Sequence, residues 1–393
     1  MRGSAESAAV GLYVHVPVCP CTCGYCDFYS VVPRAGEVEA LVGALLSELE
    51  SAVGGGVRIE TMFVGGGTPT FPAAADLCGL FDRLGRLARA HGVSEFSVDT
   101  NPGTLDDAKA GLLVGAGVNR ISLGVQSFIE AELGVLGRVH GPADIERTAG
   151  VIRRAGFAHF NVDLMFGIPG QTRASWVETL GRAIELGPDH LACYGLTYEP
   201  GTPLHGRREA GEVEPMAEAL EADLYTETAE HVKRAGFEQY EISNYARPGG
   251  RCRHNLRYWH NEATRGIGPA AASYVGGRRW RNVPDTAEYV RRVRSGEDLA
   301  VESEVLEPAR RAGETAMLML RLVEGISCER FEALTGFDPR ELFGEALMRH
   351  QAAGLVASHG DRIALTRAGR LVADTVLADF VDARGGRSAS SRG

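Results

Sequence analysis

The chain has 393 residues, of which 44% are hydrophobic and 23% charged, values typical of a globular protein with two or three domains or one large barrel plus an appendage. Its formal net charge of −10 makes it a poor candidate for non-specific nucleic-acid binding. A run of about 18 apolar residues, as a transmembrane helix needs, does not occur in the sequence.

The start of the chain favours a cytoplasmic protein. Residues 1–10 contain no basic segment followed by an apolar run, so we expect no signal peptide. Four of the eight cysteines then fall close together, at Cys19, Cys21, Cys23 and Cys26. In a cytoplasmic protein, such a cluster indicates metal binding or redox activity rather than a disulfide framework.

From residue 12 to about residue 245, short β-like runs alternate with longer stretches of helical periodicity. The strand candidates are residues 12–16, 61–64, 95–99, 120–124, 160–164 and 190–195, with one more at 239–242. The helix candidates are residues 37–53, 74–90, 105–116, 144–155, 175–186 and 218–235. This α/β alternation predicts a parallel sheet of six βα units, an open and partial (β/α)6 barrel over residues 1–245. In such barrels the functional loops follow the carboxyl ends of the strands, and the cysteine loop follows the first strand.

The remainder of the chain has a different character. Residues 246–300 are rich in Arg, Gly, Tyr and Trp with weak periodicity, and we expect a connecting segment there. Helical patterns and a hairpin around a turn at 359–361 predict a small, mostly helical, winged-helix-like domain over residues 301–382. Acidic residues outnumber basic ones in that domain, which favours an interaction or structural role over DNA binding. Residues 383–393, rich in Arg, Gly and Ser, are expected to form a disordered tail.

The cysteine loop offers three thiolates in the spacing Cys19-x3-Cys23-x2-Cys26. Thiolates are the usual ligands of iron–sulfur clusters, and three ligands to a four-iron cluster leave one iron open for chemistry. Zinc is the alternative, but a zinc site pairs such a motif with a distant one, for which only Cys252 and His254 are candidates. The loop therefore favours a [4Fe–4S] cluster on Cys19, Cys23 and Cys26.

Residues 13–28, with the pattern Y-x-H-x-P-x-C-x3-C-x-Y-C-D-F, resemble the signature of the radical S-adenosylmethionine (SAM) superfamily. The likeness is to the group that includes oxygen-independent coproporphyrinogen III oxidase (HemN) and its relatives. It implies that the open iron binds the amino and carboxylate groups of SAM, and that reduction of the cluster cleaves SAM to a 5′-deoxyadenosyl radical. Cys21 departs from the pattern; a spectator is favoured, while a resolving thiol and a substitute ligand stay open.

The same resemblance assigns residues near the cluster to SAM binding. The run Gly-Gly-Gly-Thr-Pro at residues 65–69 matches a family motif, so Gly66, Gly67 and Thr68 are expected to contact the SAM amino group. Without Cβ atoms, the backbone of such a run can approach a ligand closely. Tyr13, at the end of the first strand, is expected to touch SAM, and Tyr25 to pack on its adenine.

Four polar residues on later segments complete the expected SAM site. The resemblance gives Gln126 hydrogen bonds to a ribose or carboxylate, and it pairs Arg138 with the SAM carboxylate. Asp163, at the end of an apolar strand, matches an aspartate that binds a second nucleoside. Asp99 stands where the family has a glutamate, so a direct contact and a plain role in a helix-preceding turn both stay open.

Three features make the chain resemble the HemW branch of this group, the heme chaperones. Phe28 stands where the oxidases carry a fourth cysteine, only 18 residues precede Cys19, and residues 254–259 match a His-Asn-x-x-Tyr-Trp motif. The branch implies heme binding, and His254 is a reasonable axial ligand for heme iron. A hydrogen-bonded structural histidine is the plain alternative.

The resemblance thus implies a cytoplasmic heme chaperone that binds a [4Fe–4S] cluster, SAM and heme and delivers heme to a respiratory or storage hemoprotein. Whether the protein is also an enzyme stays open. The alternative is an oxygen-independent coproporphyrinogen III oxidase, which yields protoporphyrinogen IX by oxidative decarboxylation, and a third hypothesis is a zinc-stabilised scaffold. We expect no nucleic acid as partner, membrane association only through the recipient, and a monomer or homodimer.

Overall fold

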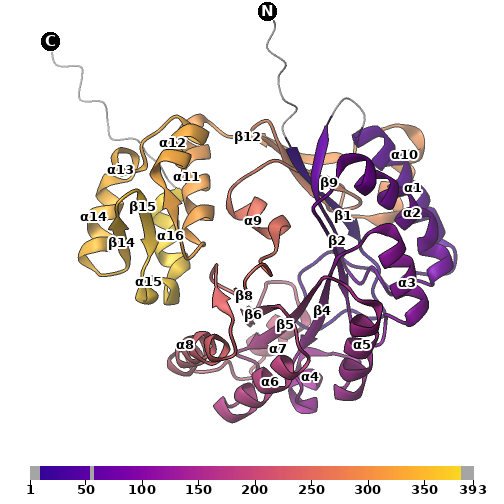
Figure 1. Ribbon diagram of the computed structural model, residues 1–393, viewed down its shortest axis with the longest axis horizontal. Coiled ribbons are helices and arrows are strands. Elements are labelled where there is room, and N and C mark those ends of the chain that lie inside the picture. Colours follow the sequence, from indigo (N-terminus) through magenta and orange to yellow (C-terminus); the bar gives the residue numbers. More distant parts are fainter. Residues whose placement is uncertain (1–8, 54–56, 382–393) are drawn as a thin grey trace, which may run out of the picture.

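One large curved sheet carries the main body of the protein. The computed structural model describes residues 9–53 and 57–381 (Figure 1). The sheet has 12 strands in the order β12-β11-β10-β9-β1-β2-β3-β4-β5-β6-β8-β7. Its parallel centre consists of β1 (Ala9–Val16), β2 (Arg58–Gly66), β3 (Glu95–Thr100), β4 (Arg120–Gln126), β5 (His159–Phe166) and β6 (His190–Gly195). These strands pair in sequence order, as the predicted open barrel of βα units requires.

Helices connect these strands and lie on the outer side of the curve, as Figure 1 shows for α1, α2, α3 and α5. The main helices are α1 (Glu37–Ala52), α2 (Ala74–His91), α3 (Asp107–Ala116), α5 (Pro142–Ala155), α6 (Arg173–Glu185) and α8 (Glu218–Arg234). Their bounds lie within a few residues of those expected from periodicity. Two short helices, α4 (Glu130–Leu136) and α7 (Pro203–Glu209), were not expected, since seven residues give periodicity little room.

Side chains of the central strands alternate between two faces, as the pleat of a strand dictates. On the outer face, apolar residues such as Leu12, Val98 and Ile121 are buried in the core beneath the helices. On the inner face, residues such as Tyr13 and Ser122 line a cavity instead. The barrel thus has its apolar core outside the sheet and a polar, functional surface inside it.

Residues 246–300 extend the main sheet, where the sequence predicted a connecting segment. They supply β9 (Thr264–Ile267) parallel to β1, antiparallel β10 (Ala272–Val275) and β11 (Arg278–Asn282), and helices α9 (Arg253–Trp259) and α10 (Thr286–Ser295); β12 (Ala300–Val305) follows. At the opposite edge, β7 (Glu238–Gln239) and β8 (Asn244–Ala246) pair with each other. The outer strands lack an apolar alternation because charged pairs such as Arg279–Glu304, 3.2 Å apart, and arginines against Trp280 hold them.

A second unit with a core of its own begins at Pro308. It comprises α11 (Pro308–Leu320), α12 (Cys328–Thr335), α13 (Pro339–Leu342), α14 (Gly344–Ala352), α15 (Arg367–Leu371), α16 (Ala373–Val381) and a small sheet of β13 (Ile326–Ser327), β15 (Arg362–Leu365) and β14 (Val356–His359). Helices with a β14–β15 hairpin agree with the winged-helix-like expectation. The predicted disordered tail, residues 383–393, lies outside the described residues. Among the helices of residues 9–53 and 57–381, none is long and apolar enough to span a membrane.

Candidate functional site

A cavity of about 810 Å³ lies on the inner face of the sheet. Its wall is formed by strand residues that point away from the outer core, together with residues of α9 and of the segment after the cysteine loop. Most of the residues that the sequence assigned to SAM or heme reach this one space: Tyr13, Tyr25, Gly66, Asp99, Gln126, Asp163 and His254. A second cavity of about 400 Å³ lies beside it, lined by Cys19, Cys21, Cys23 and Arg138.

The cysteine loop leaves β1 and is fixed by its backbone. Cys19 N donates to the Val31 carbonyl at 2.9 Å, and Cys26 N donates to the Cys23 carbonyl at 3.3 Å. Burial raises the pKa of the Cys19 and Cys26 thiols, and the neighbouring Cys23 raises each of them further. A charge on one of these thiols therefore affects its neighbours, because the predicted ligands lie near one another in the loop.

Cys21 belongs to the same group of thiols. Burial raises its pKa, and Cys23 and Cys19 contribute to the rise. Over residues 9–53 and 57–381, no three His, Cys, Asp or Glu side chains stand close enough together to hold a single metal ion. Thiols that serve a four-iron cluster each bind a different iron, so their sulfur atoms stand farther apart than the ligands of one ion.

The glycine run after β2 presses its backbone against this loop. A Cβ added at Gly67 would lie 2.6 Å from the Val18 carbonyl oxygen and 3.0 Å from Cys19 Sγ. At Gly66, where φ is +111°, a Cβ would lie 2.6 Å from the His15 ring. Only glycine fits both constraints. Next to the run, Thr68 Oγ1 lies 3.5 Å from Cys19 Sγ, so the predicted SAM loop touches the predicted cluster loop directly.

Two carboxyl groups face the cavity from β3 and β5, the two strands that flank β4. Asp163 accepts a hydrogen bond from Ser122 Oγ at 2.9 Å and one from Asn161 Nδ2 at 2.7 Å. Burial raises the pKa of both Asp99 and Asp163, and Asp163 raises that of Asp99 further. Both carboxyl groups face the cavity, where they can form hydrogen bonds with the hydroxyl groups of a ligand.

Arg138 lines the smaller cavity, and Gln126 lines the larger one. Arg138 donates to Asn101 Oδ1 at 3.0 Å and to Tyr25 Oη at 2.8 Å. Its Nε is buried and has no partner in the described part of the chain, so the N–H at this nitrogen is available to a ligand. Gln126 ends β4 with a φ of +66°, an uncommon conformation for a residue other than glycine, and it faces the cavity. Tyr25 thus holds Arg138 through its hydroxyl group, a contact that the sequence did not predict.

His254 is fully buried in the first turn of α9 and forms part of the cavity wall. Its Nδ1 lies 2.9 Å from Thr61 Oγ1, and its Nε2 lies 3.0 Å from Tyr258 Oη. Burial lowers the pKa of this imidazole to about 3, so the ring is neutral at physiological pH. Nε2 can bind another group only if its hydrogen bond with the Tyr258 hydroxyl group is broken.

The two aromatic residues of the motif at residues 254–259 point to different places. Tyr258 lines the cavity with His254. The Trp259 ring instead packs against Arg321, the residue that follows α11, whose guanidinium carbon lies 5.0 Å from the ring centre. Cys252, just before α9, is buried and its thiol donates to Glu95 Oε1 at 3.4 Å. Burial raises the pKa of this thiol, so it is uncharged.

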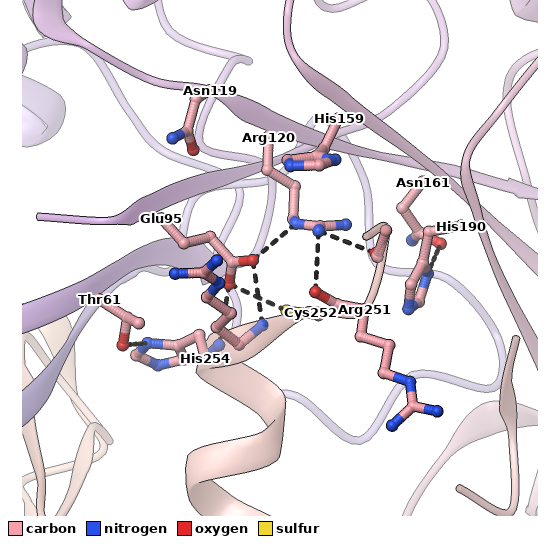
Figure 2. Close-up of polar contacts among 12 residues, drawn as sticks. Thr61, Glu95, Asn119, Arg120, His159, Asn161, His190, Arg251, Cys252 and His254 are labelled. Carbon is pink, nitrogen blue, oxygen red and sulfur yellow. Dashed lines mark hydrogen bonds and ion pairs between the residues drawn. The ribbon is translucent and has the colours of Figure 1, made fainter. Parts of the chain in front are cut away.

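Sequence reasoning missed a group of polar residues at the amino-terminal ends of the strands. Glu95, Arg120 and His190 are the first residues of β3, β4 and β6 and are almost fully buried (Figure 2). Arg120 and His190 line the cavity directly. The alternation of each strand could have identified them. Each directly precedes an apolar residue of the outer face, and successive side chains of a strand point to opposite faces, so each of the three points inward.

Residues 13–183 match the model of the radical SAM superfamily, and residues 306–372 match that of the HemN C-terminal domain. Heme chaperone HemW of Bacillus subtilis is 32% identical over 372 residues, which covers 94% of this chain and 98% of that protein. Heme chaperone HemW of Escherichia coli is 35% identical over 379 residues, covering 95% and 98%. The corresponding Mycobacterium tuberculosis protein is 37% identical over 377 residues, covering 93% of each chain.

Among solved structures, coproporphyrinogen III oxidase (HemN) from Escherichia coli superposes with a TM-score of 0.82 at 22% identity, covering 97% of this chain and 92% of that one. This likeness confirms the predicted fold: a radical SAM barrel on a parallel core sheet, followed by a smaller C-terminal domain.

Proposed function

The chain belongs to the HemW family of radical SAM proteins, and we propose that it is a heme chaperone that holds a [4Fe–4S] cluster, SAM and heme and passes the heme to a recipient hemoprotein. One observation carries the proposal. Most of the residues expected to bind SAM and the histidine expected to bind heme come from segments far apart in the sequence, yet they line the same cavity. Family relatives named as heme chaperones match along nearly the whole chain.

Cys19, Cys23 and Cys26 would hold the cluster, and Cys21 would be left free beside them. The glycine run, whose backbone touches the cysteine loop, would take the amino end of SAM, and the unpartnered N–H of Arg138 its carboxylate. Asp99 and Asp163, which face the cavity, would accept hydrogen bonds from the ribose hydroxyl groups. When bound, the cluster and SAM supply one-electron chemistry. Heme binding and transfer do not in themselves require SAM to be cleaved.

His254 would be a ligand of the heme iron. A neutral imidazole is the form that binds iron, and the lowered pKa of His254 keeps it neutral without competition from protons. The contact of Nδ1 with Thr61 fixes the ring and leaves Nε2 facing Tyr258 on the cavity side. Displacement of the Tyr258 hydroxyl group would then open the ligand position.

The proposed partner is a respiratory or storage hemoprotein in the cytoplasm or at a membrane that the recipient itself occupies. Nucleic acid is not among the proposed partners, because the chain is acidic overall. A monomer or a homodimer would serve equally, since the described site is built from one chain.

The alternative function, oxygen-independent coproporphyrinogen III oxidase, is favoured by the fold shared with HemN and by the gathering of most of the expected SAM residues around one cavity. Phe28 argues against it, because it stands at the position of a fourth cysteine. Its side chain is 72% exposed at the cavity, where it cannot replace a thiol.

An anaerobic heme titration of the reconstituted protein, followed by its Soret band, tests the proposal. We expect saturable binding of about one heme per chain and no conversion of coproporphyrinogen III to protoporphyrinogen IX under reducing conditions. Turnover by the intact cluster protein would establish the oxidase instead. Zinc without iron or sulfide after reconstitution would overturn both functions in favour of a scaffold.

A further inference from the structure

We propose that Glu95 and Arg120 are positioning residues that hold helix α9, and with it His254, at the wall of the cavity. Their importance to heme rests on the function proposed above, whereas their hold on α9 does not. Figure 2 shows the two side chains between the barrel strands and the start of the helix. Neither residue belongs to a motif that the sequence singled out.

Helix α9 lacks a cap of its own. It is seven residues long and follows Cys252, whose side chain makes no capping hydrogen bond. The first amide groups of a helix have no partner within the helix and need an acceptor from elsewhere. Glu95 provides both oxygens: Oε2 accepts from Arg253 N at 3.0 Å, and Oε1 accepts from His254 N at 2.8 Å. A carboxylate also matches the positive end of the helix dipole.

Arg120 fixes the segment that leads into the helix. Its Nε donates to Glu95 Oε2 at 3.0 Å, and its Nη2 donates to the carbonyl oxygens of Gly250 at 2.9 Å and Arg251 at 3.1 Å. The side chains of Arg120 and Glu95 are only 2% and 4% exposed. A buried ion pair is a poor source of net stability, because both charges lose their water. The pair nevertheless fixes the position of the backbone around residue 252. Arg120 of β4 holds the carbonyl groups before this residue, and Glu95 of β3 holds the amide groups after it.

The position of His254 therefore depends on two neighbouring strands. Glu95 of β3 holds the backbone N–H of His254, and Thr61 of β2 holds its ring. A helix of seven residues has little stability of its own, so these contacts decide where the imidazole stands. Loss of the Glu95 carboxylate would let α9 shift while the cysteine loop, whose hydrogen bonds run to Val31, Leu136 and Thr68, keeps its contacts.

Three full-length variants test the inference. Glu95→Gln keeps the shape of the side chain but removes its charge, and Arg120→Lys keeps the charge but loses the fork that binds two carbonyl groups. Glu241→Gln is the matched control, because Glu241 is a fully buried carboxylate whose hydrogen bonds come from Ser243 N, at 3.0 Å, and from Asn244 rather than from the first turn of α9. Each variant is reconstituted with its cluster and titrated with heme.

We expect Glu95→Gln to weaken heme binding by about 10- to 100-fold, as loss of an outer-shell partner does at metal sites, and to shift the Soret band. Arg120→Lys should act in the same direction, while Glu241→Gln should match the wild type; cluster absorbance should be unchanged in all three. Equal heme affinity and spectrum in Glu95→Gln and Glu241→Gln would overturn the inference.

A measurement without heme separates this inference from the proposed function. Amide hydrogen exchange of residues 253–259 should be about tenfold faster in Glu95→Gln than in the wild type or in Glu241→Gln, because the cap is weakened. Should the wild type bind no heme, the proposed function fails, and exchange still reports whether Glu95 holds α9. Unchanged exchange in Glu95→Gln would show that it does not.

Discussion

At the scale of single residues, burial within the cavity wall sets the chemistry. Asp99 and Asp163 have raised pKa values, His254 has a lowered one, and the Cys252 thiol is kept protonated. In each case, removal of water disfavours the charged form. Burial thus disfavours charge on these groups, while Arg120 and Arg281 bring cations to the cavity wall. In the neighbouring smaller cavity, Tyr25 and Asn101 hold Arg138.

Single cysteine replacements test the ligand set. Replacement of Cys19, Cys23 or Cys26 by Ala should abolish the broad visible absorbance of the cluster, since each removes one of three thiolates. Cys21→Ala is the control from the same loop and should retain that absorbance and its iron content. Loss of the cluster in Cys21→Ala would assign Cys21 to the ligand set.

The lowered pKa of His254 makes stability depend on pH. The unfolded chain protonates this imidazole near pH 6.5, whereas the native state holds it neutral down to about pH 3. Between these values the unfolded state binds more protons, so the free energy of unfolding falls as the pH falls. From pH 7.5 to pH 5 the loss due to this residue is on the order of 2 kcal/mol.

Urea unfolding of the wild type and of His254→Asn at both pH values measures this loss. The decrease in the free energy of unfolding should be smaller in His254→Asn by that amount. The remaining decrease comes from other histidines, such as His140 and His260, whose pKa values burial lowers to about 4. An identical decrease in both proteins would mean that His254 is accessible to protons in the native state.

At the scale of elements, sequence periodicity predicts the βα units well and the additions to them poorly. Each central strand has an apolar outer face, and each helix an apolar stripe, so local patterns suffice. Residues 246–300 join the sheet through ion pairs and arginine–aromatic contacts that leave no apolar period. Motifs likewise identified the cysteine and glycine loops, but not Glu95, whose partners on α9 lie about 160 residues away in the sequence.

Arg257 gives helix α9 a second attachment, to the edge of β1 and β2. Its guanidinium group is buried and donates to Glu60 at 2.6 Å and to the Ala9 carbonyl at 2.6 Å. Arg257→Met should lower the free energy of unfolding by about 2 kcal/mol, less than a fully buried pair would cost, because Glu60 stays partly in water. Urea denaturation checks this value, with Arg253→Met as the control, since Arg253 is exposed on the same helix. A similar loss in both variants would contradict the attachment.

At the scale of the whole molecule, the C-terminal unit supports the barrel from outside. Backbone contacts join them where Val323 N donates to the Tyr240 carbonyl at 3.0 Å, next to a bridge between Glu241 and Leu322. Arg321 of this unit packs on Trp259 at the end of α9. The helix that carries His254 is thus held by the barrel at its start and by the C-terminal unit at its end.

Three arginine–carboxylate pairs bridge the two units: Arg279–Glu314, Arg330–Glu262 and Arg367–Glu230. Exposed pairs contribute about 0.2–1 kcal/mol each. Replacing Glu314, Arg330 and Arg367 with alanine leaves the Arg279–Glu304 pair of the barrel intact and should cost about 1–3 kcal/mol, mostly in the docking of the C-terminal unit. We expect an early thermal transition of that unit and faster exchange of the α9 amides.

The matched control removes three arginines from pairs within the barrel: Arg86–Asp82, Arg173–Asp223 and Arg291–Glu288. This variant should melt in the same single step as the wild type, because no bridge between the units is lost. Since salt screens exposed charges, 1 M NaCl should reproduce part of the early transition in the wild type. Separate melting in the control, or its absence in the bridge variant, would mean that the backbone contacts at residues 240 and 323 alone hold the units together.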